Sequence, residues 1–240
     1  MKLLPHFYQV AGPCLSHFFD ATAYLLDTGE GLILLDCGTP EGFSKICSNI
    51  EKLGFDPADI REIWGTHGHY DHVGAASLWG EKSGARLLLH PNDCGQVISG
   101  DPMKTTAGLL YCTEFPPAPA EGALEDGFCR EFPNGRITVL HTPGHTMGEL
   151  SFHLELQGLS VLVAGDTLWG GFSAHIGSNE EIWKKSLDRL CGMHFDMMTF
   201  GHTGPSLACD ADTRIAELRR MFANYYNPWF KVLGEHYQYN

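Results

Sequence analysis

Apolar and polar residues alternate in short blocks along the chain, and this pattern predicts strands interleaved with helices. Residues 22–26 and 31–36 are rich in strand-forming side chains and flank a glycine-containing turn, so we expect a hairpin there. From Phe43 onward the apolar residues recur at helical spacing until Gly54 ends the run. The same two periods predict further strands over 60–66, 86–90, 137–140, 150–156, 159–164 and 197–200, and helices over 74–83, 180–191 and from about 210.

The stretch 101–136 breaks this rhythm. It contains five prolines and several glycines, and it shows no sustained period. A segment of this length without regular structure inside a compact domain is usually a functional loop. Met103, Phe115 and their apolar neighbours are numerous enough to cover a pocket, so we favour a lid insertion over a variable surface insertion.

Length and composition indicate a single domain over 1–240, with 43% hydrophobic and 19% charged residues. The formal net charge of −13 repels polyanions, so we exclude nucleic acid and membrane surfaces as partners and expect a small-molecule substrate. The N-terminus lacks the apolar segment of a signal peptide, and no apolar run is long enough to span a bilayer. The eight cysteines include no CxxC pair, which is typical of a reduced compartment, so we expect a cytoplasmic protein.

The segment 66–72 reads Thr-His-Gly-His-Tyr-Asp-His and places four potential metal ligands directly after a predicted strand. His67 and His69 are two residues apart and can converge on one cation from an extended turn. Asp71 and His72 point elsewhere and suit a second cation nearby. This is the arrangement that a two-metal hydrolytic site requires.

Three further candidate ligands are His145, Asp166 and His202. Each follows a predicted strand and is preceded by a glycine, which lets the backbone approach closely and directs the side chain out of the sheet edge. With the first four they supply five imidazoles and two carboxylates. This donor set suits Zn²⁺ and can also hold Fe or Mn.

With THGHYDH followed by TPGHT, GDT and GHTG, the chain from the hairpin near Thr22 to Gly204 resembles the metallo-β-lactamase-fold hydrolases. The resemblance implies an α+β fold, a four-layer αββα sandwich of two mixed β-sheets flanked by helices, with the metals at one edge. It also implies a carboxylate near the site at Asp36. It further implies two divalent cations per chain, Zn²⁺ being the first choice, with one on His67, His69 and His145, the other on Asp71, His72 and His202, and Asp166 bridging them.

Differences between this sequence and known members of the family exclude several of its subfamilies. True β-lactamases of this fold have Cys or Ser where Asp166 stands, so antibiotic hydrolysis is not expected. Acyl-homoserine lactonases have a functional Tyr where this chain has Trp169, so the chain differs from them. Flavodiiron proteins have Glu where this chain has His69, so it differs from those as well. Glyoxalase II enzymes append a longer helical region with basic residues that bind glutathione, and the transfer-RNA-processing nucleases need a basic exosite, which the net charge opposes.

Three functional hypotheses follow. The first is a dinuclear hydrolase that uses a metal-bridging hydroxide on a small ester, thioester, lactone or phosphoester, with Asp71 orienting the hydroxide and accepting its proton. The second is a mononuclear iron persulfide dioxygenase of the same fold, with iron on His67, His145 and Asp166. The third is a non-catalytic sensor that keeps the metals as a scaffold.

Two regions outside the ligand motifs are candidates for recognition. His175 lies in a glycine-rich loop after Asp166, where the family usually contacts its substrate, so we expect it to bind substrate. Residues 210–240 form an aromatic-rich C-terminal helix and tail. Its excess of aromatic residues predicts either a homodimer contact or a wall of the substrate pocket.

Overall fold

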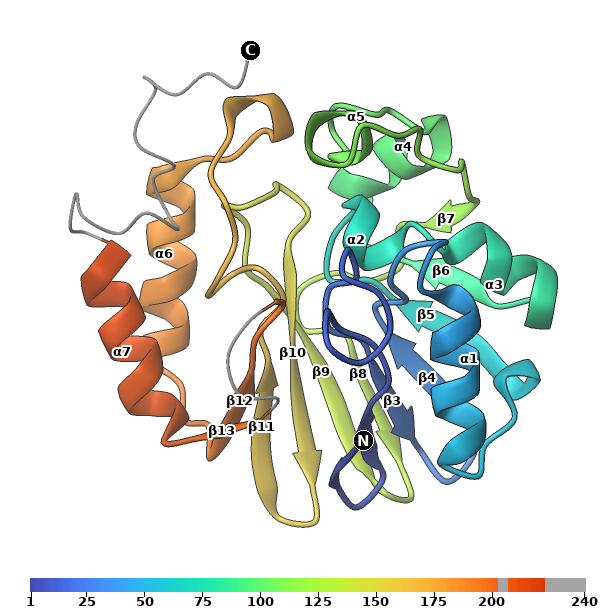
Figure 1. The fold of residues 1–240 in the computed structure, drawn as a ribbon. Helices are drawn as coiled ribbons and strands as arrows, with labels where there is room; N and C mark the ends of the chain where they lie inside the picture. Colours follow the sequence, from blue (N-terminus) through green and yellow to red (C-terminus); the bar gives the residue numbers. More distant parts are fainter. Residues whose placement is uncertain (203–206, 223–240) are drawn as a thin grey trace.

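The computed structural model describes residues 1–202 and 207–222, which form two β-sheets packed face to face with helices on both outer faces (Figure 1). The first sheet has its strands in chain order. Its first four strands pair antiparallel and its last four pair parallel, so the sheet is mixed. The strands are β1 (Lys2–Leu4), β2 (Phe7–Gln9), β3 (Tyr24–Asp27), β4 (Leu32–Leu35), β5 (Ile60–Trp64), β6 (Arg86–Leu88) and β7 (Ala120–Glu121).

The second sheet is also mixed, because β11 and β12 pair parallel whereas its other neighbours pair antiparallel. Its order is β13-β12-β11-β10-β9-β8. The strands are β8 (Cys129–Phe132), β9 (Gly135–His141), β10 (Leu150–Leu156), β11 (Leu159–Val163), β12 (Met197–Thr199) and β13 (Ala208–Cys209).

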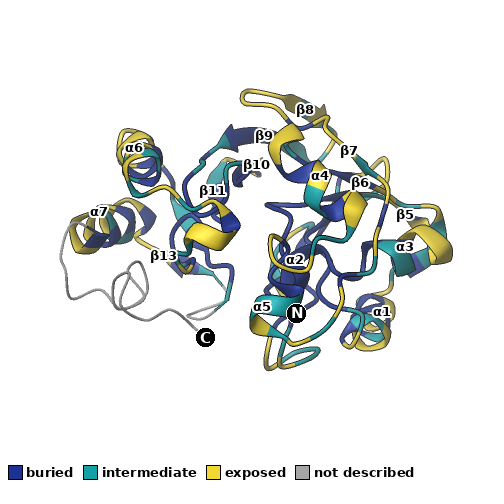
Figure 2. Cartoon of the chain, turned by 90° about the horizontal axis from the view of Figure 1, so that it is seen from above, coloured by how far each residue is buried: buried dark blue, intermediate teal, exposed yellow. Residues whose placement is uncertain are grey.

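Helices cover the outer faces of both sheets. Those that precede β8 lie beside the first sheet and the later ones beside the second (Figure 1), and their solvent-facing sides carry the exposed residues (Figure 2). The first group is α1 (Phe43–Lys52), η1 (Pro57–Asp59), α2 (Tyr70–Val73), α3 (Ala76–Ser83), α4 (Pro91–Ser99) and α5 (Ala107–Leu110). The second group is η2 (Ala174–Ile176), α6 (Glu180–Cys191) and α7 (Ala211–Phe222).

Three buried apolar clusters lie between the four layers of helices and sheets. Trp64 and Phe152 belong to the buried cluster between the sheets. Ile46 of α1 belongs to the cluster on the outer face of the first sheet, and Leu187 of α6 to the one on the outer face of the second. The central strands therefore bury both faces, which explains their nearly continuous apolar sequence. The predicted α+β αββα sandwich is confirmed.

Two local details were not predicted. The strand expected over 86–90 ends at Leu88, and Pro91 is the first residue of helix α4, where Nδ1 of His90 accepts the backbone N–H of Asn92. Proline has no N–H to lose at the first turn of a helix, so this position is favourable for it. In α7, Ile215, Leu218 and Phe222 are buried, whereas Met221 is 40% exposed.

The segment 101–136 is more ordered than its sequence indicates. It contains helix α5, strand β7 of the first sheet and strand β8 of the second, and Phe115 and Leu124 are buried in the core. These elements span only two to four residues each, too short to show a period. The prediction of a stretch without regular structure is therefore wrong, and the role of the segment as a lid stays a prediction.

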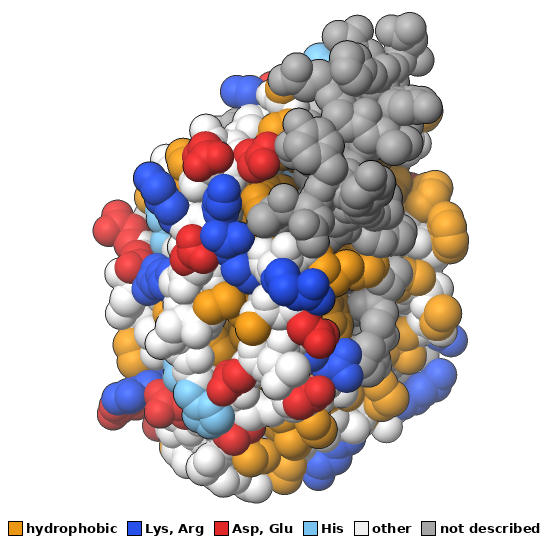
Figure 3. Space-filling view, turned by 90° about the vertical axis from the view of Figure 1, so that its left-hand side faces the viewer, with side chains coloured by type: hydrophobic (Ala, Val, Ile, Leu, Met, Phe, Trp, Pro, Cys, Tyr) orange, Lys and Arg blue, Asp and Glu red, His pale blue; other side chains and the backbone are white. Residues whose placement is uncertain are grey.

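The charged side chains on the surface and the character of the helices are relevant to the expected partners. On the part of the α6–α7 face that the structure describes, basic and acidic side chains intermix (Figure 3), and Arg219 pairs with Asp188 there. Among the described helices, none combines the length and apolar character that a bilayer crossing demands. The aromatic residues beyond Phe222 lie outside the described part of the chain.

Candidate metal centre

The seven predicted ligands come together where strands of both sheets end. The segment that follows β5 and runs into α2 carries four of them, and the loops after β9, β11 and β12 carry one each. The backbone approaches closely at two glycines in these loops. A Cβ at Gly68 would lie 2.5 Å from Nε2 of Gln96, and one at Gly201 would lie 2.2 Å from Oδ1 of Asp166. A larger residue at Gly201 would also meet the backbone of Gly165 and would force the two ligand loops apart, whereas at Gly68 it would first displace the side chain of Gln96 on α4.

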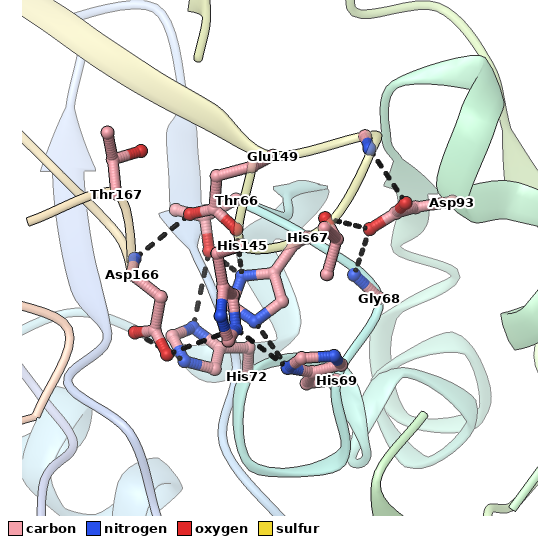
Figure 4. A network of polar contacts seen from close by, with 12 residues as sticks. Thr66, His67, Gly68, His69, His72, Asp93, His145, Glu149, Asp166 and Thr167 are labelled. Atoms are coloured by element: carbon pink, nitrogen blue, oxygen red, sulfur yellow. Dashed lines mark hydrogen bonds and ion pairs between the residues drawn. The ribbon is translucent and has the colours of Figure 1, made fainter. Parts of the chain in front are cut away.

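The first triplet consists of His67, His69 and His145, and all three side chains are buried. Nδ1 of His69 lies 2.9 Å from Nε2 of His67 and 3.1 Å from Nε2 of His145 (Figure 4). The three nitrogens thus face a common point, although His145 is separated from the other two by more than seventy positions in the sequence.

The second triplet consists of Asp71, His72 and His202. Oδ2 of Asp71 lies 3.8 Å from Nε2 of His72 and 3.4 Å from Nε2 of His202. Asp71 and His72 are buried, whereas the side chain of His202 is 28% exposed. This triplet therefore has one side open to solvent.

Asp166 lies between the two triplets. Its Oδ2 is 3.4 Å from Nε2 of His145 and 3.1 Å from Nε2 of His202, and its Oδ1 is 3.3 Å from Nε2 of His72. One carboxylate thus contacts ligands of both groups. This is the position that the sequence predicts for a bridging residue.

The donor set fits divalent cations. Nε2 of His72 and Oδ1 of Asp166 are buried and make no regular hydrogen bond to any described residue. Three imidazole nitrogens also converge in the first triplet, where neutral rings cannot all satisfy one another through hydrogen bonds. Cations bound at these two points would satisfy the unpaired atoms, and a nitrogen and oxygen set of this kind suits Zn²⁺, Fe or Mn.

Buried acceptors hold the ligand histidines on the side away from these points. Oδ2 of Asp36 lies 2.8 Å from Nδ1 of His72, so the sequence prediction of a supporting carboxylate is confirmed. Nδ1 of His67 lies 3.0 Å from the hydroxyl oxygen of Thr66. Oε2 of Glu149 lies 3.1 Å from the same nitrogen but makes no regular hydrogen bond to a described residue. The carbonyl oxygen of Gly171 lies 2.7 Å from Nδ1 of His145. Such partners fix the orientation and tautomer of a metal-binding imidazole.

Asp93 joins two ligand loops. Its Oδ2 accepts the backbone N–H of Gly68 and the hydroxyl of Thr146, and its Oδ1 accepts the N–H of Gly148, each at 2.9 Å. Gly68 lies between His67 and His69, and Thr146 follows His145. This buried carboxylate on α4 therefore sets the position of the first triplet.

The two triplets differ in their electrostatics. Burial lowers the pKa of His67, His69 and His145, and neighbouring imidazoles lower those of His67 and His69 further. Burial also opposes the charged form of His72 and His202, but nearby carboxylates outweigh it and raise both pKa values. The first triplet thus favours neutral imidazoles, the form that binds cations directly.

Tyr111 reaches the second triplet from the segment 101–136. Burial and the nearby carboxylate of Asp71 raise the pKa of its phenol. Its ring contacts the ring of Phe19 edge-on, with centroids 5.1 Å apart. Phe19, from the loop before β3, therefore packs against a residue near the site.

Sequence reasoning missed Asp93, Glu149 and Tyr111. Glu149 left a usable signal, because it is a charged residue directly before the apolar strand β10. Asp93 lies on α4, a helix that the sequence analysis did not predict, and Tyr111 follows the four-residue helix α5, which is too short to show a period. His175 lies on η2 with an exposed side chain, and its role in substrate binding stays a prediction.

Comparisons with known proteins agree with this geometry. The family described as the metallo-beta-lactamase superfamily matches residues 18–202. A hydroxyacylglutathione hydrolase of Maricaulis maris is 27% identical over 183 residues, which cover 75% of this chain and 60% of that protein. The probable metallo-hydrolase YqgX of Bacillus subtilis is 31% identical over 180 residues, which cover 75% of this chain and 79% of that protein.

The fold has close counterparts among solved structures. A metallo-β-lactamase of Cronobacter sakazakii with a HARLDQ motif superposes with a TM-score of 0.77 over 92% of this chain and 90% of that one. Its sequence is 24% identical to this chain, so the likeness concerns the fold alone.

Proposed function

This chain belongs to the metallo-β-lactamase superfamily, and we propose that it is a metal-dependent hydrolase whose seven ligands hold two divalent cations, with Zn²⁺ as the first choice. The observation that carries the proposal is the position of Asp166, whose carboxylate contacts His145 of one triplet and both His72 and His202 of the other. A single cation on the first triplet would leave Nε2 of His72, which is buried and makes no regular hydrogen bond to a described residue, without a partner.

The proposed substrate is a small ester, thioester, lactone or phosphoester. Among these we place an acyl thioester first, because one relative is named a hydroxyacylglutathione hydrolase. The chain spans 60% of the length of that relative, so the glutathione part of its substrate is not carried over. The net charge of −13 favours a neutral or weakly charged substrate over a polyanion.

The residues of the site would have different roles in such a hydrolysis. Two cations held there would acidify a water molecule and polarise the scissile group. Oδ2 of Asp71 faces both His72 and His202, so its second oxygen is available to orient the attacking water and accept a proton. Asp166 contacts ligands of both triplets and so fixes their position relative to each other. The burial of six of the seven ligands excludes bulk water from the centre.

The proposal is tested by metal content and turnover together. Protein purified without chelator and without a metal-binding tag is analysed for metals and assayed with a hydroxyacyl thioester of glutathione, phenyl acetate, a lactone and bis(4-nitrophenyl) phosphate. We expect close to two equivalents of Zn, Fe or Mn and chelator-sensitive hydrolysis of at least one substrate. One iron with the second triplet empty would favour the persulfide dioxygenase instead, and a fully loaded protein without turnover would favour the sensor.

The role of Asp71 has its own variant. Asp71→Ala should lower kcat by about 10²-fold or more while the metals are retained, because it removes the proton acceptor. Asp59→Ala, which removes an exposed carboxylate on η1, is the matched control and should leave the rate unchanged. An unchanged rate in a metal-loaded Asp71→Ala protein would remove this role.

A further inference from the structure

Three buried hydroxyl groups meet beside the loops that carry His145 and Asp166. They belong to Thr142 before His145, to Thr167 directly after Asp166, and to Ser151 on β10. The hydroxyl oxygens of Thr142 and Thr167 lie 2.8 Å apart, and that of Ser151 lies 3.0 Å from the first and 3.2 Å from the second. Asp166 directs its carboxylate to the histidines, whereas Thr167 lies farther from them (Figure 4).

The contact between Thr142 and Thr167 reaches across a whole strand. β9 and β11 flank β10 on opposite sides, so the strands that lead into the two loops are about 10 Å apart. The two threonines meet at Ser151, whose short side chain leaves room for both. The hydroxyl contact therefore joins two ligand loops whose strands do not pair with each other.

The supply of protons identifies the hydrogen bonds in this cluster. The hydroxyl of Ser151 donates to the carbonyl oxygen of Ala164 at 3.2 Å. Thr142 and Thr167 then supply one proton each for the three contacts among the hydroxyls. The two shortest contacts both involve Thr142, so Thr167 donates to Thr142 and Thr142 donates to Ser151. Hydrogen bonds in such a chain strengthen one another.

Helix α6 holds the same two loops from the outer side of the sheet. The indole N–H of Trp183 donates to the carbonyl oxygen of Thr167 at 2.7 Å. A Cβ at Gly144 would lie 2.1 Å from Cβ of Trp183, so the backbone directly before His145 packs against the helix. The helix thus limits movement of both loops away from the sheet, and the hydroxyl contact limits their movement apart.

We propose that Thr142 and Thr167 are positioning residues that set the separation of His145 and Asp166, and thereby the ability of the centre to hold both cations at once. Nε2 of His145 lies 3.4 Å from Oδ2 of Asp166. A carboxylate shared by two cations tolerates a displacement of only about 0.5 Å, because its oxygens must stay within coordination distance of both. The proposal rests on the proposed function and deepens it, because it specifies what keeps the two cation sites at a fixed spacing.

Cation affinity tests the proposal without any substrate. Protein loaded with Zn²⁺ is titrated with a chromophoric chelator, which reports the affinity of each bound equivalent. Thr142→Val and Thr167→Val keep the side-chain volume and should each weaken the more weakly bound cation by about tenfold. The double variant should be no weaker than either single one, because each substitution removes the same contact. Thr167→Ser restores the hydroxyl and should restore the affinity.

Two control variants separate positioning from general stability. Ser151→Ala removes a buried hydroxyl of the same cluster but leaves the contact between Thr142 and Thr167. It should lower the midpoint of urea denaturation about as much as Thr167→Val and change cation affinity by less than about twofold. Thr138→Val makes the same substitution on β9 outside the cluster and should change neither quantity. If Ser151→Ala weakens the cation as much as Thr167→Val does, the hydroxyls serve only stability and the proposal is overturned.

The stoichiometry of the wild-type protein tests the proposed function separately. If the wild type holds a single cation, the two-cation function fails. The positioning role still predicts that Thr167→Val weakens that one cation when it is bound by His145 and Asp166. Equal cation affinity in the wild type and in Thr167→Val overturns the positioning role in either case, and leaves the two-cation function intact if the wild type holds two.

Discussion

The two ligand triplets share the segment 67–72 yet differ in composition and exposure. His67, His69 and His145 are three buried imidazoles. The other triplet contains the carboxylate of Asp71 and the partly exposed His202. The first is enclosed by protein and the second has an open side.

The difference lies in what surrounds each triplet. The loops of the first are joined by Asp93, whose buried carboxylate accepts three hydrogen bonds from them. Near the second, the half-buried Tyr111 lies close to Asp71. We infer that the enclosed triplet provides a rigid cation site and the open one meets the substrate.

The most severe test of this comparison is to remove the residue that the triplets share. Asp166→Asn keeps the volume but loses one anionic charge and one acceptor oxygen facing His72, His145 and His202. We expect hydrolysis to fall by about 10³-fold and the metal content to drop below two, measured by steady-state kinetics and elemental analysis. Asp188→Asn, on the surface of α6, is the control, and equal metal content in both variants would refute a shared carboxylate.

The next test loosens the enclosed triplet alone. In Asp93→Asn the amide NH₂ must face a donor, either the N–H of Gly148 or the pair from Gly68 and Thr146. We expect the free energy of unfolding to fall by about 2 kcal/mol in urea denaturation, and the more tightly bound cation to dissociate about tenfold more readily. The exposed Asp59→Asn serves as control, and a selective loss of the weaker cation would reverse our assignment.

A matched pair of variants compares the carboxylates behind the two triplets. Asp36 lies 2.8 Å from Nδ1 of His72 and also accepts the N–H of Thr66 at 2.7 Å, whereas Glu149 lies 3.1 Å from Nδ1 of His67. We expect Asp36→Asn to lower cation affinity by about 10- to 100-fold and Glu149→Gln by a smaller factor, in chelator competition. The opposite ranking would mean that the shorter contact is not the stronger support.

The smallest expected effect concerns acid stability away from the ligands. Burial and the stacked ring of His141, 3.9 Å away, lower the pKa of His90 from 6.5 to about 4. Below pH 6.5 the unfolded chain binds a proton that the folded protein does not, so stability is lost as the pH falls towards 4.

His90→Asn removes this titration and keeps a side-chain acceptor for the start of α4. We expect a gain of about 1 kcal/mol at pH 4.5 relative to wild type, after screening by solvent, and little change at pH 8, measured by urea denaturation at both values. If the variant shows the same loss of stability in acid as the wild type, that loss originates elsewhere, and the ligand triplets become the first place to look.

The sequence was sufficient for features that depend on neighbours in the chain. The helix from Phe43 and the alternation in β10 follow from local periods, and the ligand types in 66–72 follow from their spacing. The family resemblance supplied the αββα fold and the roles of the remaining ligands. The sequence failed where elements are short, as in α5, β7 and β8, because two to four residues cannot display a period.

By itself, then, the sequence determined which donors the chain offers and the strands after which they stand. Only the tertiary structure decided which donors share a point in space, since the approach of His145 to His69 depends on how two sheets pack. It alone revealed Asp93 beneath the ligand loops and Tyr111 beside Asp71. Contacts between distant segments arise from the burial of common apolar layers, and no local pattern records them.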